Sequence, residues 1–265
     1  MKLIKPSFEI LEQPTIYTVK KQIELAGRTC YKSEDKITED SARNFVDMLI
    51  KNKHGAMLEH GTIYLTYPYY TAGVGFFLKN PYSVVNNVGG KYYVTTNYRV
   101  LVENDWKDEL HYHSELTEWH EKRISVRFVC DRGISHELVR HRTFSFAMES
   151  QRYCNYSKGK FDYQLTFIQP STMTDEDLEL PTGLQFTHAL KKAEESYMSL
   201  IKQGWKPQQA RAVLPNATKT EIVVTGFIKD WKHFFELRCS PSAHPDMRAL
   251  VVPLKEEFLK LNYFK

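Results

Sequence analysis

The sequence of 265 residues has few of the features that mark several broad protein classes. It contains 12 glycines and 11 prolines, which is too few for a collagen-like or low-complexity chain. None of its apolar runs approaches the roughly 20 residues that span a bilayer, so we expect no membrane-spanning segment. The first residues include Lys2, Lys5 and Glu9, which indicates that the chain does not begin with a secretion signal.

Cysteine is also scarce, and the four cysteines form no CxxC pair: Cys30, Cys130, Cys154 and Cys239. This spacing favours reduced thiols in a cytoplasmic protein. Positive and negative side chains nearly balance, with a net charge of +4. Such a charge suits an anionic ligand but is weak support for nucleic-acid binding.

What is present fits an ordinary globular protein, with 42% hydrophobic and 26% charged residues. At about 150 residues per domain the length allows one or two domains. We expect one domain over 1–265, because the sequence has no repeat, no linker-like tract and no charge block. A compact monomer of this mass would expose about 12,000 Å².

Periodicity predicts helices and strands that do not alternate regularly. Apolar residues at helical spacing predict helices over 38–53, 183–203, 227–239 and 245–261. Thr38 is the expected N-cap of the first helix, and Gly204 is the expected C-terminal cap of the second. Pro253 should kink or split the last one. Runs rich in Tyr, Thr and Val predict strands, two of them joined by a turn at Gly89 and Gly90: 62–68, 82–88, 91–103, 124–130 and 163–168. This order predicts an α+β fold with a mixed or antiparallel sheet and packed helices.

The segment 136–156 (HELVRHRTFSFAMESQRYCNY) carries the densest chemistry. Arginine binds phosphate through a planar fork and serine adds a neutral donor, so this set is typical of a phosphate or pyrophosphate site: Arg140, His141, Arg142, Ser145, Ser150 and Arg152. The alternative is a solvated basic face with surface ion pairs. Only Glu137 and Glu149 are close enough in sequence to neutralise the arginines.

We expect no metal site. His136 and His141 are five residues apart, whereas a zinc-protease helix needs a spacing of four. His111 and His113 are expected to share a strand face but have no third ligand nearby. Gly73 and Gly75 form only a fragment of a dinucleotide fingerprint, so a flavin or nicotinamide site must form without a Rossmann loop.

A second set of cations lies towards the C-terminus: Arg211, Lys229, His233 and Arg238. Arg211 and Arg238 are embedded in apolar sequence, and a buried arginine needs a partner. That partner is either an anionic ligand or a carboxylate such as Glu236 or Asp246. For Lys229 a solvated helix end is an equally good interpretation.

Four ordered motifs resemble those of flavin-dependent thymidylate synthases. They are Arg140, His141 and Arg142 followed by Ser150 and Arg152; HGAMLEH at 54–60; ARAVLP at 210–215; and WKHFFELR at 231–238. The resemblance covers roughly residues 16–65 and 123–262 and implies the α+β fold of that family, with 66–122 as a family-variable insertion. It implies an FAD enzyme that methylates dUMP to dTMP, with methylenetetrahydrofolate as carbon donor and NADPH as reductant. The family forms cytoplasmic homotetramers whose active sites are shared between subunits, with no nucleic acid or membrane partner.

The resemblance also implies site residues. Arg238 would activate the uracil ring, where a cation stabilises developing negative charge. Residues implied to bind dUMP are Glu137, Arg140, Glu149, Ser150, Gln151, Arg152, Arg211 (from another subunit) and Arg238. Residues implied to bind the flavin or folate are His54, Arg140, His141, Arg142, Lys229 and His233. Cys154 is expected to be inert.

The chain departs from the family pattern at three places. Met148 stands where the family has a polar Glu or Gln, Phe227 replaces a common Asn, and Ser242 replaces a frequent His. Two functions of other classes remain open from the residues alone. One is a non-enzymatic single-stranded nucleic-acid binder that stacks bases on its many aromatic side chains, and the other is a metal hydrolase built on His111 and His113.

Overall fold

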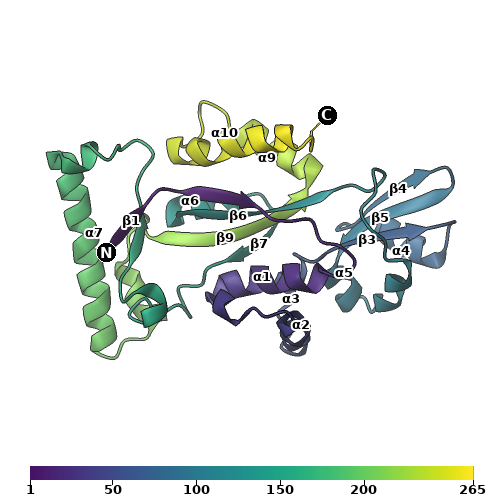
Figure 1. The fold of residues 1–265 in the computed structure, drawn as a ribbon, viewed down its shortest axis with the longest axis horizontal. Helices are drawn as coiled ribbons and strands as arrows, with labels where there is room; N and C mark the ends of the chain where they lie inside the picture. The colour runs from purple at the N-terminus through teal and green to yellow at the C-terminus, as the bar shows by residue number, and fades with distance from the viewer. Residues whose placement is uncertain (265) are drawn as a thin grey trace.

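A computed structural model describes residues 1–264. Its centre is an antiparallel sheet of four strands in the order β2-β6-β9-β7 (Figure 1): β2 (Ser7–Ile10), β6 (Arg123–Asp131), β9 (Lys219–Phe227) and β7 (Ser145–Met148). The long strands β6 and β9 pair over nine residues, from Arg123 opposite Phe227 to Asp131 opposite Lys219. Helices cover both faces of this pair, and most residues of the two strands are buried.

Helices cover both faces of the central sheet. On one face lie α6 (Arg132–Leu138), α9 (Ile228–Arg238) and α10 (Pro245–Lys260), which bury a cluster rich in aromatic side chains. Trp231 is fully buried there, and its indole nitrogen donates to the Ile124 carbonyl (3.2 Å). The other face carries α1 (Val19–Tyr31), with α2 (Ser41–Lys51) and α3 (Gly55–Leu58) beside it (Figure 1).

A second sheet lies at one end of the molecule (Figure 1). It is antiparallel in the order β3-β5-β4 and has its own apolar core. It comprises β3 (Thr62–Tyr67), β4 (Val84–Val88) and β5 (Lys91–Asn97), with α4 (Ala72–Lys79), α5 (Tyr98–Glu103) and the 3-10 helix η2 (Lys107–Tyr112) packed around it. Most of this second sheet therefore falls within 66–122.

The opposite end of the molecule is formed by the long helix α7 (Pro181–Lys202) and by β1 (Lys2–Ile4), which pairs in parallel with β8 (Thr166–Ile168) (Figure 1). The short helix α8 (Pro207–Ala210) packs against α7. Four further 3-10 turns complete the fold: η1 (Glu34–Lys36), η3 (Gly159–Phe161), η4 (Asp177–Glu179) and η5 (Arg211–Val213). The accessible surface is 14,201 Å², well above the roughly 12,000 Å² of a compact monomer.

The predicted α+β fold is confirmed, as are the positions of its main helices and strands. The Gly89–Gly90 turn has φ values of +60° and +81°, which only glycine adopts readily at both central positions of a hairpin. Gly204, with a φ of +93°, directly follows the C-cap of α7.

Several local predictions are wrong. The strand expected over 91–103 ends at Asn97, because the Asn97 side chain accepts from the Val100 backbone N–H and begins α5. The first predicted helix begins at Ser41 rather than Thr38, and the strand predicted over 163–168 is only three residues long. His111 lies in η2 rather than on a strand. Pro253 does not split α10, which continues to Lys260.

Candidate functional site

A cavity of about 500 Å³ lies where β6 begins and β9 ends, facing the second sheet. Two residues predicted to bind the cofactor, Arg142 and Lys229, both line it, although they are 87 positions apart in the sequence. Arg123 also lines it, and the acidic side chains in its wall are Glu59 and Asp230. We call it the cationic cavity, because its three cations outnumber these two carboxylates.

Arg123 is a functional candidate that sequence reasoning missed. It is only 4% exposed, and it donates to the Glu59 carbonyl (3.0 Å) and to the hydroxyls of Thr62 and Ser145 (both 3.3 Å). Its Nε is buried without a hydrogen-bond partner among the described residues. Burial lowers the pKa of Arg123 to about 10, so the guanidinium stays charged at neutral pH. Arg123 lies outside every motif, so the sequence carried no signal for it.

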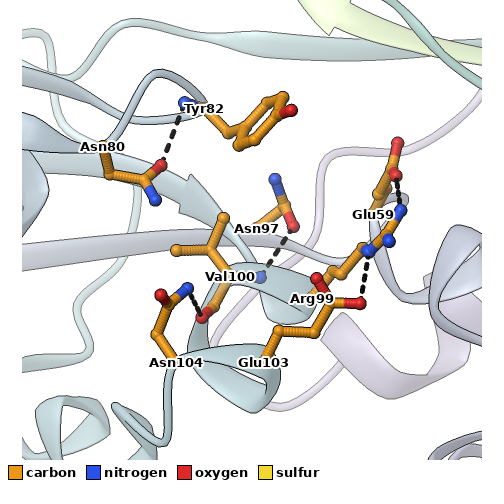
Figure 2. Close-up of a pocket in the computed structure, with 8 residues that line it drawn as sticks. All are labelled: Glu59, Asn80, Tyr82, Asn97, Arg99, Val100, Glu103 and Asn104. Carbon is orange, nitrogen blue, oxygen red and sulfur yellow. Dashed lines mark hydrogen bonds and ion pairs between the residues drawn. The ribbon is translucent and has the colours of Figure 1, made fainter. Parts of the chain in front are cut away.

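A second cavity, of about 400 Å³, adjoins the cationic cavity and is shown in Figure 2. We call it the amide-lined cavity because Asn80, Asn97 and Asn104 contribute to its wall. Arg99 bridges two carboxylates on one side of it, Glu59 (2.5 Å) and Glu103 (2.8 Å). Space here is tight around Gly55, because a Cβ at that position would meet Glu103 and Arg99 at about 3 Å. The exposed His54 directly precedes Gly55, so this predicted ligand lies near the wall of the second cavity.

Arg238 forms a compact group with two other predicted residues, Glu137 and His141. Its Nη1 donates to the Glu137 carboxylate (2.7 Å), its Nη2 to the Glu137 carbonyl (2.9 Å) and its Nε to His141 Nε2 (2.9 Å). Burial, with Arg238 and His233 nearby, lowers the pKa of His141 to about 4. His141 is therefore neutral at pH 7 and accepts at Nε2.

Neither of the two carboxylates named as alternative partners of Arg238 pairs with it. Glu236 lies beside the exposed His233 instead, at 3.6 Å, and Asp246 accepts from Ser171. Helix α9 turns Arg238 towards α6, so its carboxylate comes from Glu137, which is 101 residues away in sequence.

Glu149 is 1% exposed, and both of its carboxylate oxygens have partners inside the protein. One accepts from the Tyr156 hydroxyl (3.0 Å) and the other from Lys219 Nζ (3.0 Å). Lys219 also pairs with Glu221, which pairs with Lys32. Glu149 and Glu137 are thus both engaged by cations from outside the segment 136–156.

The arginines of that segment are consequently left without carboxylates. Among residues 1–264 the arginines in ion pairs are Arg28, Arg99, Arg127 and Arg238. Arg140, Arg142 and Arg152 form no ion pair in this part of the chain, and all three are exposed. The alternative of a face neutralised by surface ion pairs is not what the structure shows.

Ser150, Gln151 and Arg152 follow the end of β7, beside the C-terminus of α1. The Ser150 backbone N–H donates to the Cys30 carbonyl (2.9 Å), and the Arg152 guanidinium lies 5.4 Å from the centre of the Tyr153 ring. Burial and the Glu149 carboxylate raise the pKa of Cys154 to about 12. This thiol is therefore a poor nucleophile, as expected from the sequence.

Arg211 is exposed in η5, although its apolar sequence context predicted burial. It lies before the first residue of β9, whereas Lys229 follows the last. Nine strand residues span about 27 Å. One subunit therefore brings together Arg142 with Lys229, and Glu137 with His141 and Arg238, but leaves Arg211 and the Ser150–Arg152 segment apart from the cationic cavity.

No group of three or more His, Cys, Asp or Glu side chains within 1–264 is placed to hold a metal ion. No helix in the same residues is both long and apolar enough to cross a membrane.

Comparisons with known proteins agree with the motifs. The model of the family described as thymidylate synthase complementing protein matches residues 106–261. A flavin-dependent thymidylate synthase of Corynebacterium aurimucosum is 28% identical over 87% of this chain and 72% of its own length. One of Corynebacterium efficiens is 35% identical over 55% of this chain and 60% of its own length.

A UMP/dUMP methylase from Streptomyces cacaoi, crystallised with 5-Br UMP, shares the fold. The structural match covers 98% of this chain and 92% of the methylase chain, with 16% sequence identity and a TM-score of 0.50. The expected enzyme class is confirmed by the names of the relatives. Because the family model spans more than half of the sequence, this chain belongs to the thymidylate synthase complementing protein family.

Proposed function

We propose that the protein binds FAD and converts dUMP to dTMP, with methylenetetrahydrofolate as carbon donor and NADPH as reductant. The observation that carries the proposal is that Arg140, Arg142 and Arg152 lack carboxylate partners within residues 1–264, while both nearby acids are engaged elsewhere. Unpaired arginines beside serine hydroxyls suit phosphate and pyrophosphate groups. The names of the relatives, which are called flavin-dependent, support the flavin.

The residues present fit a flavin dinucleotide. Arg123 has a buried, unpartnered Nε in the cationic cavity, and Arg142 and Lys229 add exposed charge at the same place. When bound, the reduced flavin supplies hydride chemistry. Arg142, Lys229 and, through its neutral imidazole, His141 would hold the cofactor.

Arg238 would stabilise negative charge on the uracil ring. Its guanidinium is held in one orientation by Glu137 and His141, so less rotational freedom is lost when the ring binds. Ser150, Gln151 and Arg152 would hold the phosphate of dUMP, with Arg211 from a neighbouring subunit.

We propose a cytoplasmic homotetramer with shared sites. Its support is the separation of Arg211 and Arg152 from the cationic cavity in one subunit, together with an accessible surface about 2,200 Å² above that of a compact monomer. The cysteines within 1–264 are all free thiols, which fits a reducing compartment.

The absorption spectrum of the purified protein and a dTMP-product assay with and without added FAD test this function. We expect a flavin spectrum and FAD-dependent dTMP formation. A colourless protein that takes up no FAD, or one that prefers oligonucleotides to dUMP, would remove the proposal.

The variant Arg152→Ala tests whether Arg152 binds dUMP rather than FAD. Because Arg152 is exposed and lies apart from the cationic cavity, we expect dUMP binding to weaken about tenfold or more, as for the loss of a charge-assisted hydrogen bond, and FAD binding to change little. Titration calorimetry with each ligand measures both, and the opposite order would show that the phosphate sites are assigned wrongly.

A further inference from the structure

The cationic and amide-lined cavities are two parts of one trough. Glu59, Tyr82 and Asn97 line both of them. Asn97 is the last residue of β5 and Tyr82 lies in the turn before β4, whereas Arg123, Arg142 and Lys229 belong to the central sheet and the segments that flank it. The segment 66–122 therefore supplies one wall of the site rather than a remote extension.

The two parts differ in chemistry. The cationic cavity contains Arg123, whose desolvated guanidinium has an unpartnered Nε and whose other contacts are a carbonyl and two hydroxyls. A buried arginine without a carboxylate is unfavourable unless an anion completes it. This part of the trough therefore suits phosphate groups.

The amide-lined cavity offers directional hydrogen bonds instead of positive charge. Asn97 uses its oxygen to accept from Val100 N–H, and Asn80 uses its oxygen to accept from Tyr82 N–H, so the nitrogen of each amide is left to donate (Figure 2). Asn104 donates to the Val100 carbonyl, which leaves its oxygen to accept. A free amide nitrogen can donate to a ring nitrogen of adenine, and a free amide oxygen can accept from its exocyclic amine.

Tyr82 adds a flat apolar surface at the shared wall. It is 65% exposed, and its only hydrogen bond shown in Figure 2 is through its backbone. Loss of one base stack on an exposed aromatic ring typically weakens binding about tenfold.

We propose that the second sheet builds a subsite for the adenosine diphosphate half of a dinucleotide. The phosphates contact Arg123, Arg142 and Lys229, and the adenine stacks on Tyr82 within reach of Asn80 and Asn97. Cavities of about 400 and 500 Å³ are of the size that such ligands occupy. The proposal rests on the proposed function, in which FAD and NADPH both carry this half.

The test compares Tyr82→Ala with Tyr69→Ala in the full-length protein. Tyr69 is a matched control, because it is 64% exposed and outside the lining of both cavities. Affinities are measured for FAD and FMN, and for NADP⁺ and nicotinamide mononucleotide, so that each dinucleotide is paired with a ligand lacking the adenosine part.

We expect Tyr82→Ala to weaken one dinucleotide about tenfold, as the loss of one base stack predicts, with its mononucleotide and the control variant unchanged. A loss confined to FAD assigns the subsite to FAD, and a loss confined to NADP⁺ assigns it to NADPH. Unchanged binding of both dinucleotides, or an equal loss for a dinucleotide and its mononucleotide, overturns the subsite. If the wild-type protein binds FAD normally in that case, the proposed function survives; if the wild type binds no flavin, the function itself fails.

Inorganic pyrophosphate probes the cationic cavity separately. It should raise the melting temperature of the wild-type protein. Arg142→Ala should reduce that rise because it removes one phosphate contact, and the core stays intact because Arg142 is exposed. No stabilisation of the wild type by pyrophosphate would overturn the phosphate half of the proposal.

Discussion

At the scale of single residues, the chemistry of the site depends on which carboxylates form ion pairs with which cations. Glu137 binds Arg238 and Glu149 binds Lys219, so two acids that could have neutralised their own segment are occupied. Tertiary structure decides which ion pairs form, and it pairs Arg238 with Glu137 rather than with the alternatives Glu236 and Asp246.

Arg238→Ala should reduce dTMP formation at least 100-fold, the usual loss when one group that stabilises developing charge is removed. Removal of the guanidinium leaves the Glu137 carboxylate, which is 23% exposed, without its cation, so circular dichroism must show that the variant is folded. Lys192→Ala, in an exposed pair on α7, serves as control and should retain activity. Near-normal turnover by Arg238→Ala would mean that the uracil contact is misplaced.

His60 should make the protein less stable in acid. It is completely buried, its Nδ1 lies 2.8 Å from Thr225 Oγ1, and burial with the nearby Arg123 lowers the pKa of His60 to about 3. In the unfolded chain a histidine has a pKa near 6.5. As the pH falls below 6.5 the unfolded state takes up the proton first, so the free energy of unfolding decreases down to about pH 3.

Between pH 6.5 and pH 4 this loss should be on the order of 3 kcal/mol, at about 1.4 kcal/mol per tenfold change in proton affinity. Urea unfolding at several pH values measures it. His60→Asn should flatten the pH dependence, whereas His188→Asn, at an exposed position of α7, should not. Equal slopes for all three proteins would contradict this assignment.

At the scale of elements, periodicity predicted most of the fold. The strand at 124–130 and the helix at 227–239 were predictable because apolar residues recur at every second position in the strand and at helical spacing in the helix. The helix α5 was missed because Tyr98 to Glu103 continue a β-type composition, and only the Asn97 side-chain cap ends the strand. The cap and the burial of Tyr98, Val100 and Leu101 together outweighed local propensity there, which a pattern of residue types does not reveal.

Pro253 interrupts the hydrogen bonding of α10 without breaking the helix. Because proline has no N–H, the carbonyl one turn earlier lacks its helical donor. Pro253 is exposed, so Pro253→Ala should restore that bond without a clash and raise the free energy of unfolding by about 1–3 kcal/mol. Thermal or urea unfolding measures the change, and a less stable variant would show that the proline is needed for the path of the helix.

At the scale of the whole molecule, the site residues fall into groups that one subunit does not unite. Arg142 and Lys229 could be predicted as neighbours only through the family motifs, because the sequence does not show that β7 and β9 pair. Arg123 could not be predicted as a site residue at all, since it lines the cationic cavity only because the second sheet packs beside the start of β6. The exposed position of Arg211 likewise follows from the way η5 precedes β9.

Mixing two inactive variants tests whether sites are shared. Arg211→Ala and Arg238→Ala should each be inactive alone. If each site takes Arg238 from one subunit and Arg211 from another, random reassembly should restore roughly one quarter of wild-type activity, because one site in four receives both arginines. Activity that stays at the level of the separate variants, in tetramers shown by light scattering to have mixed, would mean that each subunit works alone.

The pairing of Glu137 and Glu149 with distant cations has one more consequence. A synthetic peptide of residues 136–156 would leave both acids free to fold back on its own guanidinium groups, so it should capture nucleotides poorly. The affinity for anions therefore arises only when α9 and β9 have docked. A chain trapped before that step would have the complete sequence of the motif but would bind anions poorly.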